Sequence, residues 1–326
     1  MLDVFFNPSY GKLYEQIEGG AFDTFEYAGR DGTICNMYIK RPVSWLVDDV
    51  QYYDVTTPYG YGGPVVTAGE TSESLIAEYY TAWAAYCRGS RIIAEFVRFH
   101  LYDNADLRLY YPGEVIRISD NVVRSLTPTM DEIWMEFEHK VRKNVKRAQN
   151  NGLTVTADAT GEHLSAFLNI YYKTMKRNRA KNYYYFETSY FEDINRTLNG
   201  QYIYFHVWHN EQIISTELVL YSQDYAYSFL GGTLEDFYPM RPNDLLKYEI
   251  IKWCKETGRR AFILGGGYHS GDGIYRYKKA FAPGNDVPFY IGRKVFQSEI
   301  YHQLIAIRAQ KPDFDSESQF FPLYRS

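Results

Sequence analysis

The fold is decided by residues 202–232, which read YIYFHVWHNEQIISTELVLYSQDYAYSFLGG. Runs rich in aromatic and β-branched residues alternate here with short polar stretches such as Asn210-Glu211, and this pattern is typical of successive strands. The stretch ends in the glycine pair Gly231-Gly232. We therefore predict three strands in a row, over residues 202–208, 212–221 and 224–230.

A helix and a further strand are expected after the glycine pair. Asn243 should cap a helix that runs to about Thr257, and Gly258 should end it. Residues 260–264 read as a last strand, closed by Gly265-Gly266-Gly267. The mixture of strands and helices places this part of the chain in the α/β or α+β class.

The same order of elements occurs earlier in the chain. Gly62 and Gly232 are about 170 residues apart, and so are Arg91 and Ala261. We interpret this agreement as the duplication of one domain, although two unrelated α/β halves would also alternate their elements. The earlier copy is expected to consist of strands over 22–28, 33–40 and 50–55, a glycine-rich loop over 57–64, a helix from Thr71 or Ser72 to about Cys87, and a strand over 91–99.

Between the two halves lies a basic helix that Asn150-Asn151-Gly152 should end. We place the domain boundary directly after it. The first domain is then 1–152, completed by 290–326, and the second is 153–289. From Lys311 onward the chain is polar, and we expect an extended or loosely held end.

Composition and charge limit the functional classes. The chain has 326 residues, of which 45% are hydrophobic and 23% charged, as in a globular protein of two ordinary domains. A net charge of −5 argues against a protein coated in nucleic acid but permits a local basic patch. Three scattered cysteines and seven histidines show no metal-ligand spacing, so no metal is expected. Without a secretory signal or a long apolar run, the sequence predicts a cytoplasmic protein.

Three groups of residues could carry chemistry. The first is the basic helix, whose cations could attract phosphates or simply face solvent. Its cations are Lys140, Arg142, Lys143, Lys146 and Arg147. The second group consists of Lys176 and Arg177 and the aromatic run that starts at Tyr183. It could bind a diphosphate and stack a sugar or base, or it could be only the end of a helix followed by a packed aromatic turn. The third is Tyr277-Lys278 after a glycine-rich turn, where a lysine can stabilise a developing oxyanion.

Tyrosine is unusually frequent, with 33 residues. Most of these rings should pack in sheets, but a tyrosine-rich cleft also suits polar ligands such as sugars and nucleotides. The tyrosines that we single out as substrate contacts are Tyr59, Tyr61, Tyr183 and Tyr227.

Several motifs together resemble the Fem family of aminoacyl transferases. In the first half the matching stretches are DVTTPYGYGGP (residues 54–64) and KVRKNVKRA (residues 140–148). In the second half they are NDLLKY (243–248), LGGG (264–267) and YRYKKAF (275–281), where Tyr277 stands in place of the usual Phe. The resemblance therefore runs from about residue 50 to residue 281.

The resemblance implies two tandem GNAT-like acyltransferase domains with a cleft between them. Family members move an amino acid from aminoacyl-tRNA to an amine on a peptidoglycan precursor, without a cofactor. It implies a nucleotide-linked or lipid-linked muropeptide and tRNA as partners, and a monomer. By the same resemblance Lys278 would meet the donor ester, with Tyr277 beside it. Lys40 or Arg41, together with Lys176 or Arg177, would hold acceptor phosphates, and the basic helix would bind tRNA or other phosphates.

The attacking amine must lose a proton, and a nearby carboxylate could accept it. Asp103 and Asp106 follow the strand over 91–99 and are candidates for this role. An acyl-CoA-dependent N-acyltransferase acting on an amino sugar is the alternative, although Gly231 to Asn243 lacks the glycines of a pyrophosphate loop. A non-catalytic glycan-binding relative would keep the same fold.

Overall fold

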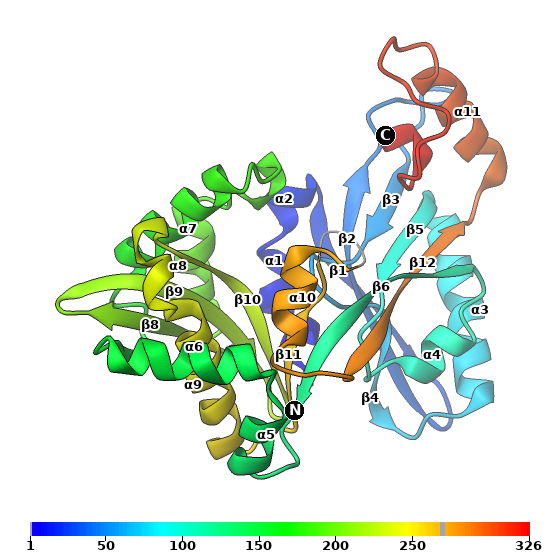
Figure 1. The fold of residues 1–326 in the computed structure, drawn as a ribbon. Coiled ribbons are helices and arrows are strands. Elements are labelled where there is room, and N and C mark those ends of the chain that lie inside the picture. Colours follow the sequence, from blue (N-terminus) through cyan, green and yellow to red (C-terminus); the bar gives the residue numbers. More distant parts are fainter. Residues whose placement is uncertain (1, 268–270) are drawn as a thin grey trace. The chain divides into compact units, whose positions relative to one another are not determined.

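The computed structural model describes residues 2–267 and 271–326, which divide into two compact units (Figure 1). The central unit comprises Met1–Val4 and Ser119–Val287. The flanking unit comprises Phe5–Ile118 and Pro288–Ser326. None of the described helices is both long and apolar enough to cross a bilayer.

The flanking unit has strands in the order β1-β2-β3-β5-β12, with β4 also paired to β2. Neighbouring strands run antiparallel except β3 and β5, which are parallel. A parallel pair needs a crossover connection, and helix α3 (Glu73–Gly89) provides it. The strands are β1 Ala21–Ala28, β2 Gly32–Pro42, β3 Tyr53–Thr56, β4 Val65–Gly69, β5 Ile92–Arg98 and β12 Asp286–Val295.

The central unit repeats this plan. Its strands follow the order β6-β11-β10-β9-β8-β7, and among the described strands of this unit only β10 and β11 are parallel. Helix α9 (Pro242–Glu256) provides the crossover between them. The strands are β6 Glu114–Ser125, β7 Thr154–Asp158, β8 Tyr202–His209, β9 Gln212–Tyr221, β10 Tyr225–Thr233 and β11 Ala261–Gly265. The repeat predicted from the sequence is thus confirmed: an antiparallel meander, a helix and a parallel strand occur in both units.

Alternating side chains of β8 show that helices cover both faces of the central sheet. Phe205 contacts Trp253 of α9, whereas Tyr204 contacts Phe167 of α7 (Leu164–Arg177). On the α9 face, α6 (His139–Asn150) packs against α9 and buries its apolar stripe. The remaining helices of this unit are α5 Met130–Glu136, α8 Thr188–Thr197 and α10 Gly273–Lys279.

Helix α9 begins differently from the prediction. Asn243 does not cap it: Arg241 is the N-cap residue, with φ 65°, and its side chain makes no capping hydrogen bond. Pro242 occupies the first helical position, where its fixed φ suits the helix and its missing N–H is not needed. Gly258 follows the helix in a left-handed conformation, φ 80°, as its predicted role requires.

The end of the chain is more ordered than the sequence indicated, so the expected loose tail is wrong. Tyr324 is buried, and its hydroxyl donates to Asp54 Oδ2 at 2.9 Å. Arg325 reaches the same carboxylate, and Arg308 holds the Ser326 carbonyl. The remaining helices of the flanking unit are α1 Pro8–Lys12, α2 Glu15–Glu18, α4 Ala105–Leu109 and α11 Ser298–Arg308. The 3₁₀ turns of the central unit are η2 Asn182–Tyr184 and η3 Glu235–Met240, η4 Leu323–Arg325 belongs to the flanking unit, and η1 Val4–Phe6 lies where the two units divide.

Apart from the division at residues 4/5, the compact units divide the chain at residues 118/119 and 287/288, within β6 and β12. The boundary predicted from the sequence lay after Gly152 instead. The difference has a physical reason: α6 packs its buried face on α9 and therefore belongs with the later strands.

A buried acid in the flanking unit gives a first stability prediction. Glu95 accepts hydrogen bonds from Trp83 Nε1 at 3.0 Å and from the Tyr111 hydroxyl at 3.1 Å, and burial raises its pKa from 4.5 to about 7. Between these values the folded state binds more protons than the unfolded state, so stability should fall as pH rises across this window. We expect Glu95→Gln to remove a fall on the order of 3 kcal/mol between pH 5 and 8.

Urea unfolding at both pH values measures this effect. Glu70→Gln, at an exposed position, is the matched control and should keep the pH dependence of the wild type. An equally large fall in Glu95→Gln would show that another group causes it.

Candidate functional site

The central unit contains a cavity of about 500 Å³ where β10 and β11 stop pairing. Their register covers only Tyr225–Tyr227, and the rest of β10 lines the cavity. The end of α7, the start of α9 and helix α10 supply the other walls; Figure 1 shows α10 beside these strands. The polar side chains that line it are Thr174, Arg177, Asn178, Glu217, Ser228, Thr233, Tyr238, Arg241, Asn243, Asp244, Lys247, Tyr277 and Lys278.

The glycine pair seen in the sequence forms part of this wall because there is no room for side chains. A Cβ atom on Gly232 would lie 2.2 Å from Thr174 Oγ1 of α7. A Cβ atom on Gly231 would lie 2.5 Å from the Thr216 carbonyl oxygen. Close contact of α7 and β9 with β10 therefore requires glycine at both positions.

Lys278 presents the most distinctive chemistry in the cavity. It lies on α10, which Asp272 caps by accepting a hydrogen bond from the Tyr275 amide at 2.7 Å. Its Nζ donates to the Gly266 carbonyl at 2.7 Å. Burial, with a smaller contribution from the charge of Lys247, lowers the pKa of Lys278 from 10.5 to about 8. At neutral pH the side chain is therefore a poorly solvated ammonium group, suited to stabilise negative charge that develops nearby.

A buried ion pair lies next to it. Lys247 of α9 and Glu217 of β9 are 5% and 4% exposed, and Lys247 Nζ contacts both carboxylate oxygens of Glu217. The same Nζ donates to Ser228 Oγ at 2.6 Å. Because each charge satisfies the other, the cavity wall holds two opposite charges in fixed positions.

Tyr277 and Asp244 complete the polar wall. The Tyr277 hydroxyl is buried beside Asn243 but makes no well-aligned hydrogen bond within the described residues. Burial, with the charges of Asp244 and Glu217, raises its pKa well above the ordinary value, so it stays protonated. Asp244 accepts from Asn144 Nδ2 at 3.1 Å, and burial raises its pKa. The tyrosine thus offers an unused donor or acceptor inside the cavity.

Of the second predicted group, only Arg177 reaches the cavity. Its guanidinium donates to the Thr233 carbonyl at 3.2 Å and lies 5.2 Å from the Tyr238 ring. Lys176 is exposed, and neither it nor Tyr183 lines the cavity. Tyr227 is buried, and its hydroxyl donates to Asp3 at 2.9 Å, which ties it to packing within the central unit.

The other predicted substrate contacts lie in the flanking unit. Arg41 is buried, with Nε donating to Asp54 Oδ1 at 2.7 Å and Nη1 to Glu18 at 3.2 Å, so its predicted phosphate contact is replaced by a structural ion pair. Lys40 stacks over Tyr53 at 4.4 Å beside a surface depression. Tyr61 packs edge-on against Phe5, and the carbonyl of Tyr59 accepts from Tyr10.

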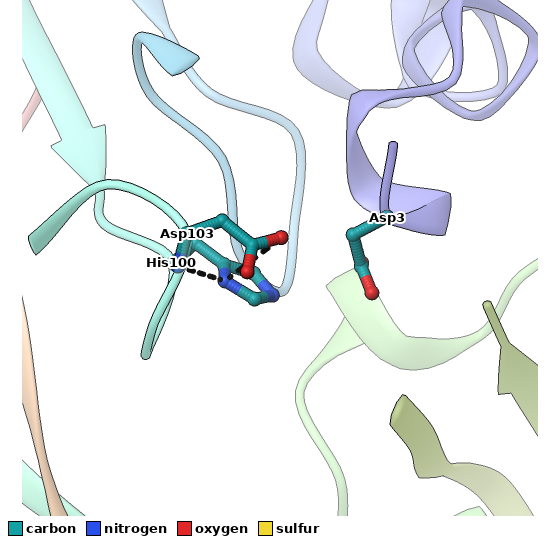
Figure 2. Close-up of side chains that lie close together, drawn as sticks. All are labelled: Asp3, His100 and Asp103. Atoms are coloured by element: carbon teal, nitrogen blue, oxygen red, sulfur yellow. Dashed lines mark hydrogen bonds and ion pairs between the residues drawn. The ribbon is translucent and has the colours of Figure 1, made fainter. Parts of the chain in front are cut away.

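Figure 2 shows how the first candidate base is held. Asp103 lies with a carboxylate oxygen 3.6 Å from His100 Nδ1, and this nitrogen also accepts from the Asp103 amide at 3.0 Å. Burial lowers the pKa of His100 to about 4, so the imidazole is neutral. Asp106 lies exposed in the first turn of α4. Both aspartates belong to the flanking unit, as does His100; Asp3, also drawn, belongs to the central unit.

The cations of the basic helix, now α6, have different surroundings. Arg142 donates to the Met135 carbonyl at 2.8 Å and to that of Phe137, which holds the junction between α5 and α6. Lys140 pairs with Glu138 at 3.0 Å. Lys143, Lys146 and Arg147 are exposed along a surface groove of about 770 Å³.

Sequence reasoning found Lys278, Tyr277 and Arg177 but missed Glu217, Ser228, Asp244 and Lys247. For two of these residues the sequence itself contained an indication of a special role. Glu217 interrupts a strand between apolar Ile214 and Leu218, and Lys247 follows Leu245-Leu246 on the buried side of a helix. Charges at apolar positions indicate either partners or function, because an unpaired buried charge is costly.

Known proteins share parts of this sequence and its fold. Residues 136–279, which include Glu217, Lys247 and Lys278, match the model of the acetyltransferase (GNAT) domain family. Among solved structures, FemX superposes with a TM-score of 0.69 at 14% identity, over 92% of this chain and 94% of that chain. No curated protein matches the sequence significantly.

Two further structures share the fold. The C-terminal domain of a putative lysylphosphatidylglycerol synthetase from Agrobacterium fabrum has a TM-score of 0.57 at 13% identity, over 89% of each chain. L-PGS from Bacillus licheniformis has a TM-score of 0.54 at 15% identity, over 88% of this chain and 92% of that chain. The GNAT fold expected from the sequence, and its Fem-like form, are thereby confirmed.

Proposed function

We propose that this chain, a Fem-like protein of the GNAT acyltransferase fold, transfers an aminoacyl group from aminoacyl-tRNA to an amine of a peptidoglycan or related cell-envelope precursor. The observation that carries the proposal is the half-buried ammonium group of Lys278 in a cavity beside the Lys247–Glu217 ion pair. Such a site can stabilise the oxyanion that every acyl transfer to an amine must form.

Acyl transfer from an ester to an amine requires little more than alignment of the two substrates and stabilisation of the charge that develops. The amine nitrogen attacks the ester carbon, an oxyanion forms, and the carbon–oxygen bond to the donor breaks. The proton lost by the amine ends on the departing oxygen, so the reaction balances without a cofactor. Holding donor and acceptor together is worth up to about 7–11 kcal/mol. Both oxygens of Glu217 contact Lys247, so we assign this pair to positioning and assign no base.

The charges around the cavity suit an aminoacyl donor. An aminoacyl ester carries an ammonium group beside the reacting carbonyl, and the Asp244 carboxyl group and the Tyr277 hydroxyl in the wall can accept hydrogen bonds from it. Arg177 and Arg241 bring positive charge to the same cavity, which suits a phosphate-bearing substrate. Lysylphosphatidylglycerol, in the name of one structural neighbour, is itself an aminoacyl ester of a lipid headgroup, which supports aminoacyl transfer as the type of reaction.

Acyl-CoA is the second candidate donor, because the matching family model is that of an acetyltransferase domain. Two features of the connection between β10 and α9 argue against acyl-CoA as the donor. Its residues form the 3₁₀ turn η3, and Pro242 removes an amide from the first turn of α9, where a pyrophosphate would need backbone donors. A non-catalytic glycan-binding protein would bind its ligand without turnover.

Thermal-shift measurements separate these candidates, since a ligand that binds the folded state raises its melting temperature. We expect stabilisation by charged tRNA or by a UDP-linked muropeptide and none by acetyl-CoA. At a ligand concentration of about 100 times Kd the gain is roughly 2.7 kcal/mol. Uncharged tRNA is the control for binding of the nucleic acid alone. Stabilisation by acetyl-CoA alone would contradict the aminoacyl donor.

A further inference from the structure

Three cations on α6 pair with no other side chain of the described residues. Lys143, Lys146 and Arg147, here called the α6 patch, are exposed and make no ion pair or hydrogen bond with the residues that the structure describes. They lie within two turns of one helix and line the same groove of about 770 Å³. Cations without internal partners are available to a partner outside the molecule.

Three acidic residues of α5 and of the junction between α5 and α6 already have partners. Glu136 pairs with Arg124, Glu138 pairs with Lys140, and Glu132 accepts hydrogen bonds from Thr129 in a capping box. The patch is therefore a local positive region on a chain whose net charge is −5. Its charge complements an anionic partner at short range, because opposite surface charges are screened within roughly 10 Å.

The apolar residues of the groove distinguish between anionic partners. Met135, next to the patch, is 67% exposed. The Trp134 ring packs against Phe137 and Tyr248, so the exposed side chains beside the cations are the apolar Met135 and the His139 ring. Cations next to an exposed apolar side chain fit a bilayer, whose headgroups carry phosphates and whose interface accepts apolar groups.

We propose that the α6 patch docks the protein on a bilayer surface that carries anionic phosphate headgroups, with Met135 reaching into the interface. The apolar side of α6 is committed to the core, since Val141, Val145 and Ala148 are at most 1% exposed. The helix therefore binds headgroups through its cations and does not insert. Such contact is reversible and weakens with salt. It would bring a lipid-linked substrate to the protein, but it stands independently of the proposed reaction.

Co-sedimentation with vesicles tests the proposal. Wild-type protein should bind vesicles of equal parts phosphatidylglycerol and phosphatidylcholine, and should not bind vesicles of phosphatidylcholine alone. Removing one cation should weaken binding about fivefold, so Lys143→Gln with Lys146→Gln and Arg147→Gln should weaken it about a hundredfold. Met135→Ser should weaken it several-fold without changing the dependence on salt.

A control variant with the same change of charge is Lys12→Gln with Lys173→Gln and Lys311→Gln, at exposed positions on other elements. It should bind like the wild type, and circular dichroism should show that both triple variants are folded. An equal loss of vesicle binding in both triple variants would show that only the net charge matters, and would overturn the proposal. Absence of binding to anionic vesicles would also overturn the proposal. If the patch variant lost tRNA binding but kept vesicle binding, the patch would be a nucleic-acid surface and the proposal would be wrong. None of these outcomes depends on turnover.

Discussion

Replacing Lys278 with methionine should lower the turnover of acyl transfer about a hundredfold or more while leaving the protein folded. The variant keeps the length and the apolar stem of the side chain but cannot stabilise an oxyanion. Rates under single-turnover conditions measure the effect on the chemical step directly. Lys279→Met is the matched control, because the neighbouring lysine pairs with Asp286 and does not line the cavity. Equal rates for the wild type and Lys278→Met would remove Lys278 from the reaction.

The same variant has a stability signature that does not depend on activity. The pKa of Lys278 is lowered from 10.5 to about 8, so between these values the unfolded state binds more protons than the folded state. Stability should therefore rise with pH across this window, and the buried charge should reduce stability below it. We expect Lys278→Met to raise the melting temperature by a few degrees at pH 7. The gain should shrink as pH approaches 10; a constant gain would contradict the lowered pKa.

Replacing Lys247 with methionine should cause the largest loss of stability, about 3–5 kcal/mol, because Glu217 would be left charged and buried. Glu217→Gln should also destabilise, by stranding the ammonium group of Lys247. The double variant Glu217→Gln with Lys247→Met should recover much of the loss, since neither charge remains. Urea unfolding of the four proteins measures the coupling between the two residues.

Lys252→Met is the control for this cycle. Lys252 lies on the same helix and pairs with Glu249 at 3.9 Å, but both side chains are exposed enough that the pair should contribute less than about 1 kcal/mol. Losses that add without coupling in the Glu217–Lys247 cycle would mean that the two charges are independently solvated, contrary to their burial.

Much of the fold could be predicted because local sequence determines it. Ser72 caps α3 through a hydrogen bond from the Leu75 amide, and the strands around residues 202–232 and the helix after them were visible in the sequence pattern. Strands β6 and β12 were missed because their pairing is distant in the sequence. In β12, Ile291 pairs with Arg98, and in β6, Val123 pairs with Ile263. Neither strand shows the regular alternation of apolar and polar residues that would have identified it.

The site was harder to predict, because the type of each residue can be read from the sequence but the residues that it contacts are known only once the chain has folded. Lys278 could be found from a glycine-rich turn and a family motif. Arg41 could not be separated from a phosphate ligand, because only folding shows that Asp54 neutralises it. Lys247 and Glu217 are 30 residues apart, and β9 must pack beside α9 before their pairing exists.

The central claim, that the cavity around Lys278 performs aminoacyl transfer, is tested most directly by following the mass of an amine-bearing acceptor. A UDP-linked muropeptide would be incubated with the wild type and with charged tRNA or acetyl-CoA as the donor. We predict that the acceptor gains the mass of the amino acid with charged tRNA and none with acetyl-CoA, and that Lys278→Met loses the gain while Lys279→Met keeps it. A gain from acetyl-CoA alone, or an undiminished gain in Lys278→Met, would contradict the account.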